Sequence, residues 1–258
     1  MCIIDSIGGN TMRQFIETKR GRTTLRGTID MPQLSIDQKA PVVIFFHDIM
    51  SSSRVYPSDT LAQLFIQYAY AVVRFDFSGH GRSDGRIEKY TLKKQIEDAK
   101  AMVSYVSELE FTSRIILLGH GIGGNIAAMI ADEVPCESII LLGPSCDVAD
   151  TIKEGLFYNR RFNKKRLPRR LYLEGRAISK HYLEETRDVS LKPCEKEVLI
   201  LQGKKDEIVS YKKTWLYYKH LKHSTIHLIN NGTHDFRSCL KETCYWIDEY
   251  LMKKDNHS

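Results

Sequence analysis

The sequence predicts an α/β fold in which a mostly parallel central sheet is flanked by helices. Apolar segments of strand length alternate along the chain with longer segments of helical period, which is typical of parallel sheets with helical crossovers. One segment, 42–46, is apolar without interruption, as expected of a strand that is buried on both faces. With 258 residues, of which 42% are hydrophobic, the chain can bury the core of one α/β domain.

The first half of the chain supplies one edge and the centre of the predicted sheet. Two strand-like segments flank the turn residues 20–22 and predict an antiparallel hairpin at the sheet edge. A long amphipathic helix carries apolar residues at helical spacing from Ile96 to Val106. The expected elements are strands at 12–19, 23–29, 42–46 and 71–75 and helices at 59–68 and 92–109.

The second half continues the alternation and closes with a helix. The expected elements are strands at 114–118, 138–142, 198–201 and 225–229 and helices at 122–132 and 239–252. Parallel strands place their carboxyl ends at the same edge of a sheet. We therefore expect residues in the loops after these strands to converge, although they lie far apart in the sequence.

One segment interrupts the alternation. From 144 to about 192 the sequence shows no convincing strand of the central sheet, and it lies where a cap over a site can be inserted. We expect a core formed by residues 1–143 and 191–258 and an inserted cap at 144–190. Seven Arg and Lys side chains fall within 159–170. They fit a solvated cap surface or a basic rim that steers anionic ligands, whereas no motif supports nucleic-acid binding.

A glycine-rich motif follows the strand predicted at 114–118. Residues 119–124 read Gly-His-Gly-Ile-Gly-Gly, so a strand runs into a tight turn and then a helix. This is the setting of the nucleophile elbow Gly-x-Ser-x-Gly, whose central serine attacks an ester or amide carbonyl. Here the central residue is Gly121, which has no side chain. We expect the backbone of this turn to be strained for other residues and adopted by glycine at little cost.

Two further strand ends carry the partners that such a nucleophile needs. Asp206 follows the strand at 198–201, and His234 follows the strand at 225–229, just before the last helix. The order nucleophile, acid, base is that of the elbow hydrolases. In a triad the acid orients the imidazole, which deprotonates the nucleophile. The sequence therefore predicts a catalytic site at Gly121, Asp206 and His234 from which the serine is absent.

The sequence argues against several other classes of function. The six cysteines show no CxxC or metal-ligand spacing, and we expect neither a metal nor a cofactor. The glycines of 119–124 imitate a dinucleotide fingerprint, but no acidic ribose-binding residue follows the next strand. No stretch is long and apolar enough to span a bilayer, and the N-terminus is a poor signal peptide. We expect free thiols and a cytoplasmic protein.

Two sequence motifs carry a family resemblance. Residues 76–85, Asp-Phe-Ser-Gly-His-Gly-Arg-Ser-Asp-Gly, are followed by Ile-Glu-Asp-Ala at 96–99. They resemble the bacterial cinnamoyl and feruloyl esterases, which lie close to serine-aminopeptidase-like hydrolases and monoglyceride lipases. The resemblance covers essentially the whole core and weakens in the cap. It implies an α/β-hydrolase fold and hydrolysis of carboxylic esters through an acyl-enzyme.

The resemblance also implies roles for individual residues. It places the nucleophile at Gly121, the acid at Asp206, the base at His234 and the oxyanion hole at the backbone N–H groups of Ile49 and Ile122. Beside that hole the chain has Asp48 where the family has glycine. A carboxylate there opposes the charge of an oxyanion. We expect no neighbouring side chain to replace the missing serine.

Two hypotheses about function follow. The first is a hydrolase-fold protein of esterase ancestry that lacks normal serine-dependent activity, which retention of Asp206 and His234 favours. The second is a non-catalytic protein that binds a ligand or a partner on the same fold, which the paired changes at Gly121 and Asp48 favour. In either case the expected partner is a small-molecule ester or carboxylate ligand, and a homodimer is possible.

Overall fold

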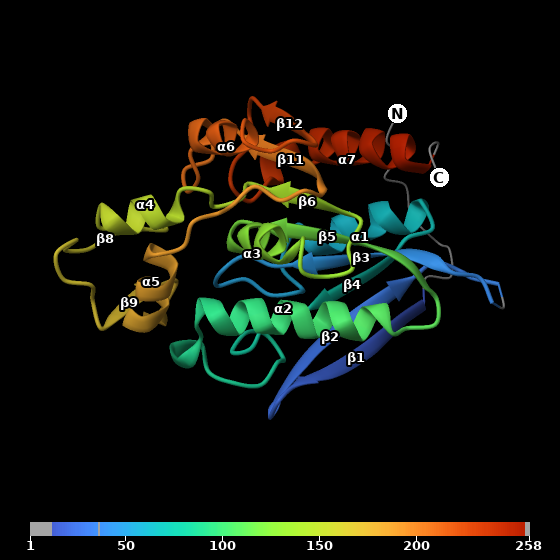
Figure 1. Cartoon of the computed structure of the whole chain (residues 1–258), viewed down its shortest axis with the longest axis horizontal. Helices are drawn as coiled ribbons and strands as arrows, with labels where there is room; N and C mark the ends of the chain where they lie inside the picture. Colours follow the sequence, from blue (N-terminus) through green and yellow to red (C-terminus); the bar gives the residue numbers. More distant parts are fainter. Residues whose placement is uncertain (1–11, 36, 256–258) are drawn as a thin grey trace.

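The computed structural model describes residues 12–35 and 37–255, and its fold is α/β (Figure 1). The strands of the central sheet are β1 (Met12–Arg20), β2 (Thr23–Met31), β3 (Ala40–Phe46), β4 (Ala71–Phe75), β5 (Thr112–His120), β6 (Ser138–Leu142), β11 (Glu197–Gly203) and β12 (Ser224–Ile229). They lie in the order β1-β2-β4-β3-β5-β6-β11-β12. β2 pairs antiparallel with β1 and β4, and all other neighbours are parallel. The predicted fold class and edge hairpin are confirmed.

Helices cover both faces of this sheet. They are α1 (Ser58–Gln67), α2 (Leu92–Ser107), α3 (Ile122–Ile130), α6 (Tyr211–Tyr218) and α7 (Leu240–Asp255). Side chains of β3 alternate between two buried clusters, Ile44 lying in the cluster of α2 and α3 and Val43 in that of α1 and α7. This burial on both faces explains why the strand is an uninterrupted apolar run in the sequence.

The helices begin close to their predicted positions. Thr91 caps α2, because its hydroxyl accepts a hydrogen bond from the backbone N–H of Lys94 at 3.2 Å. Two short 3₁₀ turns, η1 (Ile87–Lys89) and η2 (Arg237–Cys239), precede α2 and α7. The last helix therefore starts at Leu240, one residue later than the sequence indicates.

The register of the parallel strands brings their carboxyl ends to one rim. Gly119 of β5 lies opposite Phe46 of β3 and Leu141 of β6. Leu201 of β11 lies opposite Leu142 of β6. The loops after β3, β5, β11 and β12 therefore meet, and they carry the residues that the sequence singles out.

The segment 144–190 adds small elements at one end of the sheet (Figure 1). They are α4 (Val148–Lys153), β7 (Leu156–Phe157), β8 (Arg160–Arg161), β9 (Arg170–Leu173), β10 (Arg176–Ser179) and α5 (Lys180–Arg187). β7 pairs with β8 and β9 with β10, and none of these four strands joins the central sheet. Phe157, Ile178 and Tyr182 of this segment pack into the cluster of α2 and α3. Its boundaries as a cap stay a prediction.

The described residues also bear on disulfides, membrane spans and metal ligands. Among residues 12–35 and 37–255 no disulfide bond joins the cysteines, which are Cys136, Cys146, Cys194, Cys239 and Cys244, whereas Cys2 lies outside the described residues. In the same ranges no helix has the length and apolar character needed to cross a membrane. Nor does this part of the chain contain a group of three or more His, Cys, Asp or Glu side chains that could hold a metal ion.

Candidate active site

The turn after β5 has the strained backbone of a nucleophile elbow. Gly121 lies between β5 and α3 with φ 54° and ψ −119°, a region that residues with a Cβ rarely adopt. At Gly123 an added Cβ would lie only 2.2 Å from the carbonyl oxygen of Phe46. The start of α3 therefore approaches β3 more closely than a side chain allows. The turn thus has the backbone geometry of an elbow, with a glycine at its central position.

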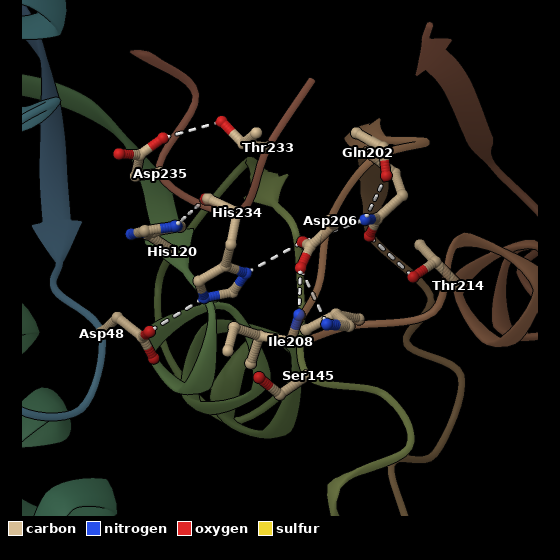
Figure 2. A network of polar contacts seen from close by, with 12 residues as sticks. Asp48, His120, Ser145, Gln202, Asp206, Ile208, Thr214, Thr233, His234 and Asp235 are labelled. Carbon is tan, nitrogen blue, oxygen red and sulfur yellow. Dashed lines mark hydrogen bonds and ion pairs between the residues drawn. The ribbon is translucent and has the colours of Figure 1, made fainter. Parts of the chain in front are cut away.

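Asp206 and His234 meet at the rim, as the sequence predicts (Figure 2). His234 Nδ1 lies 2.9 Å from Asp206 Oδ2. The backbone N–H groups of Ile208 and Val209 each donate to Asp206 Oδ1 at 2.8 Å. The side-chain amide of Gln202 donates to Oδ2 at 3.2 Å. These bonds fix the buried carboxylate and thereby the orientation of the imidazole ring.

The other nitrogen of the His234 ring faces Asp48, which follows β3. Nε2 lies 3.0 Å from Asp48 Oδ2, so the ring stands between two carboxylates (Figure 2). Asp48 Oδ1 accepts the backbone N–H of Ile122 at 2.7 Å and the hydroxyl of Tyr158 at 2.5 Å. An ionised carboxylate can only accept, so both ring nitrogens carry a hydrogen. His234 is therefore an imidazolium.

The Asp48 carboxylate occupies the space that a side chain at residue 121 needs. A Cβ added to Gly121 would lie 2.2 Å from Asp48 Oδ1 and 2.3 Å from its Cγ. A serine at 121 therefore collides with Asp48 as it is held here. Asp48 thus reaches this space from the loop after β3. The expectation that no neighbouring side chain replaces the missing serine stays a prediction. The side chain of Asp48 and the absence of one at Gly121 are complementary in shape.

The pKa values of the site describe a buried ion triplet. Burial alone would lower the pKa of His234, but hydrogen bonds to Asp206 and Asp48 raise it to about 10. Burial would raise the pKa of Asp48, but the hydrogen bond and the charge of His234 lower it to about 2. At neutral pH two carboxylates and one imidazolium give the triplet a net charge of about −1.

One of the two donors predicted for an oxyanion hole is engaged within the protein. The backbone N–H of Ile122 donates to Asp48 Oδ1. Ile49 is buried in the loop after β3, and its role as the second donor stays a prediction. Asp48 was expected to repel an oxyanion near this hole; its own oxygen takes the donor instead. An acyl oxygen can reach Ile122 only if the carboxylate moves away.

Tyr158 is a site residue to which the sequence assigned no role beyond stacking or packing. It forms a two-residue hairpin loop with Asn159 between β7 and β8, and both residues have positive φ, 45° and 61°. Asn is common at such positions, but a bulky Tyr is not. Its hydroxyl lies 3.3 Å from Ser145 Oγ as well as 2.5 Å from Asp48. Only the Asn in this short loop signals the turn in the sequence.

His120 packs against the site without entering it. Its Nε2–H donates to the backbone carbonyl of His234 at 2.8 Å, and the two rings lie 4.9 Å apart. Burial and the charge of His234 lower the pKa of His120, which keeps this ring neutral. The sequence favoured a packed or hydrogen-bonded role for this residue, and the geometry agrees.

A series of neighbouring aromatic rings extends from His234 to His47, the residue before Asp48. Successive ring centroids lie 4.6 to 6.2 Å apart. We call this series the aromatic belt, and its members are Tyr158, Phe157, Tyr182, Tyr90, His80 and His47. Within the belt, the Tyr90 hydroxyl and His80 Nε2 are buried without a hydrogen-bond partner. Buried polar atoms of this kind are rare and suit contact with a bound molecule.

A known protein family shares a large part of this sequence. A model of the serine aminopeptidase S33 family matches residues 37–187, more than half of the chain. The chain belongs to that family. The matched part of this S33 protein includes Asp48 and the elbow, and it ends before Asp206 and His234.

A solved structure resembles the whole fold of this S33 protein. Est1E from Butyrivibrio proteoclasticus, solved with ferulic acid bound, has a TM-score of 0.86 and 25% sequence identity. The similarity covers 92% of this chain and 98% of Est1E. The resemblance to feruloyl esterases that the sequence indicates is thereby supported at the level of fold and ancestry.

Curated relatives match shorter stretches. The mitochondrial palmitoyl-protein thioesterase ABHD10 of Bos taurus is 26% identical over 135 residues, which cover 50% of this chain and 43% of the relative. A monoacylglycerol lipase of Mycolicibacterium smegmatis is 32% identical over 95 residues, which cover 36% of this chain and 34% of the lipase. The chain thus spans less than half the length of either relative. Both names denote enzymes that cleave acyl bonds.

Proposed function

We propose that this protein is an α/β-hydrolase of esterase ancestry that does not cleave esters through a serine acyl-enzyme. The observation that carries the proposal is the Asp48 carboxylate in the space beside Gly121. Gly121 supplies no hydroxyl, and the same carboxylate holds the N–H of Ile122. His234 already carries a proton on both nitrogens, so it cannot act as a general base near neutral pH.

The arrangement also constrains the ligand. Esters and carboxylates were both expected from the sequence, and Est1E binds ferulic acid. The net negative charge of the triplet opposes a second carboxylate at the position of Asp48. We therefore propose an uncharged ligand, with its apolar part against the aromatic belt and the segment 144–190 acting as the cap.

A second candidate function is ligand binding without chemistry. It is favoured by the saturation of the elbow donor, because Asp48 already occupies the N–H of Ile122 and Nε2 of His234. On this view the protein is a receptor for a small ester-like molecule. The homodimer and the cytoplasmic location expected from the sequence stay predictions, and the former is measured by light scattering.

The test of the proposed function is a two-by-two set of variants assayed on nitrophenyl esters and labelled with a fluorophosphonate. The set contains the unmodified protein, Gly121→Ser, Asp48→Gly and the double variant. We expect the first three to be silent, because Gly121→Ser leaves the space and the hole blocked and Asp48→Gly adds no nucleophile. The double variant should exceed the unmodified protein by about 10³-fold or more, since serine nucleophiles contribute up to about 10⁶ in turnover.

Two outcomes decide against the proposal. Labelling of the unmodified protein by the fluorophosphonate at residues 119–124 would show an acyl-enzyme route that needs no serine there. Equal ester turnover in all four proteins would show that neither residue 48 nor residue 121 blocks the reaction. Circular dichroism on each variant confirms that the comparison is made between folded proteins.

A further inference from the structure

We infer that Asp48 is itself a nucleophile that attacks an uncharged alkyl halide. The attack forms an alkyl ester on the Asp48 side chain, and water then hydrolyses this ester. The inference rests on the proposed function, because it requires that the place of the serine belongs to this carboxylate. It adds a reaction that does not pass through residue 121. Aspartate carboxylates are established covalent nucleophiles in other enzymes.

The hydrogen bonds leave one oxygen of Asp48 available for attack. A carboxylate offers about two acceptor positions on each oxygen. Oδ1 has both filled, by the N–H of Ile122 and the hydroxyl of Tyr158. Oδ2 has one described partner, Nε2 of His234. The free position therefore lies on Oδ2, and the side chains of His234 and Asp48 are 15% and 7% exposed.

The same contacts suit the hydrolysis of the ester that would form. Once Oδ2 carries an alkyl group, Oδ1 is the carbonyl oxygen of an ester. The donors on Oδ1, from Ile122 and Tyr158, then lie where negative charge develops as water adds to Cγ. His234 loses one of its two anionic neighbours, so its pKa falls and it can become a base. Asp206 keeps the ring in place through Nδ1.

The reaction balances without a further reagent. Oδ2 of Asp48 forms a bond to the alkyl carbon while the carbon–halogen bond breaks and halide departs. The imidazolium of His234 then releases its Nε2 proton to solvent. Water adds to Cγ and gives a proton to His234, which passes it to the alkyl oxygen as the ester bond breaks. The new carboxyl group protonates His234 again, so the sum is alkyl halide plus water to alcohol, halide and a proton.

Two features select the class of electrophile. The donors that contact Asp48 are already bound to it, so none of them can protonate an alkoxide leaving group. A leaving group that departs as a stable anion, such as halide, is therefore favoured. The triplet carries a net charge of about −1, which disfavours anionic reagents. The aromatic belt, with buried Phe157 and Tyr182, suits an apolar group such as a phenylalkyl chain.

The experiment is a single turnover of 3-phenylpropyl bromide by the full chain in ¹⁸O-labelled water. Water that attacks Cγ leaves its oxygen in Asp48, so we expect ¹⁸O in the peptide containing Asp48 and none in the first alcohol released. The anionic reagent 4-bromobutyrate should react at least about tenfold more slowly because of charge repulsion. Label in the alcohol alone would show direct attack by water and overturn the inference.

A trapping variant supplies an independent readout. His234→Gln lacks the base, so the alkyl ester should accumulate on Asp48 as a mass increase that hydroxylamine removes, unlike a thioether on cysteine. Asp48→Asn should lose both adduct and turnover by at least about 100-fold. Asp188→Asn, on the exposed end of α5, is the matched control and should react as the unmodified protein does.

The outcomes separate this inference from the proposed function. Adducts only on cysteines, or no adduct on Asp48 in either protein, would overturn the nucleophile while the proposed function stands. Fluorophosphonate labelling of the unmodified protein would overturn the proposed function itself. If His234→Gln does not fold, the ¹⁸O content of Asp48 in the unmodified protein still decides.

Discussion

Among the individual residues of the site, Asp48 and Gly121 share a single space. Gly121 keeps an elbow backbone with φ 54°, and the carboxylate of Asp48 fills the space beside it. Hydrogen bonds with His234, Ile122 and Tyr158 hold that carboxylate in place. Positions 48 and 121 therefore form one structural unit.

This sharing predicts that the two positions are coupled in stability. Gly121→Ala should destabilise the protein through backbone strain of about 1–3 kcal/mol and through overpacking against Asp48 of about 1–3 kcal/mol more. In an Asp48→Gly background only the strain remains. Urea denaturation of the four proteins measures the difference. Additive effects within about 0.5 kcal/mol would contradict a shared volume.

The sequence predicts which residues form the site better than it predicts the contacts between them. Gly121, Asp206 and His234 could be placed because each follows an apolar strand in an order typical of triads. The occupation of the elbow by Asp48 could not, since it depends on how far the loop after β3 reaches toward α3. That distance is fixed by the close approach of Gly123 to Phe46, which no local pattern reveals.

At the scale of elements, the hairpin β7–β8 connects the segment 144–190 to the site. Its loop residue Tyr158 has φ 45° and donates to Asp48, while Phe157 of β7 is fully buried. A bulky residue in the left-handed region is kept only when surrounding contacts determine it. The hydroxyl of Tyr158 is such a contact.

Removal of that hydroxyl gives a second prediction. Tyr158→Phe should lower the free energy of unfolding by about 1–3 kcal/mol, because a hydrogen bond to a charged, buried acceptor is lost. Tyr172→Phe is the matched control, since Tyr172 of β9 is 58% exposed, and it should change stability by less than about 0.5 kcal/mol. Equal effects of the two substitutions in thermal or urea unfolding would refute the role of the Tyr158 contact.

Predictability differs between the central sheet and the segment 144–190. Strands such as β3 and β6 are buried on both faces, so composition alone marks them. The strands β7 and β8 have two residues each, and Arg160 and Arg161 of β8 are exposed. Such short polar strands are stabilised by their turn and by packing against the core, and they leave no periodic signal.

At the scale of the whole molecule, the buried triplet links global stability to pH. The folded pKa of His234, about 10, lies above its unfolded value, so its contribution is present below pH 6.5 and is lost as pH rises toward 10. The folded pKa of Asp48, about 2, lies below its unfolded value, so its contribution is lost as pH falls from about 4 toward 2. The triplet therefore stabilises the fold most between about pH 4 and 6.5.

The third prediction compares the unmodified protein with Asp48→Asn across this range. The stability advantage of the unmodified protein should be largest near pH 6 and shrink between about pH 6.5 and 9.5, with a limiting slope of about 1.4 kcal/mol per pH unit. Chemical denaturation at several pH values measures it. An advantage that grows with pH would mean that His234 is neutral in the folded protein.

The space shared by residues 48 and 121 also restricts which substitutions can accumulate during evolution. Conversion of this chain to a serine esterase requires two simultaneous replacements, because one alone leaves the turn either overfilled or empty. Natural drift through single substitutions therefore meets a barrier in both directions. Homologous chains should carry either glycine at position 48 with serine at position 121 or the pair found here, and mixed pairs should be scarce.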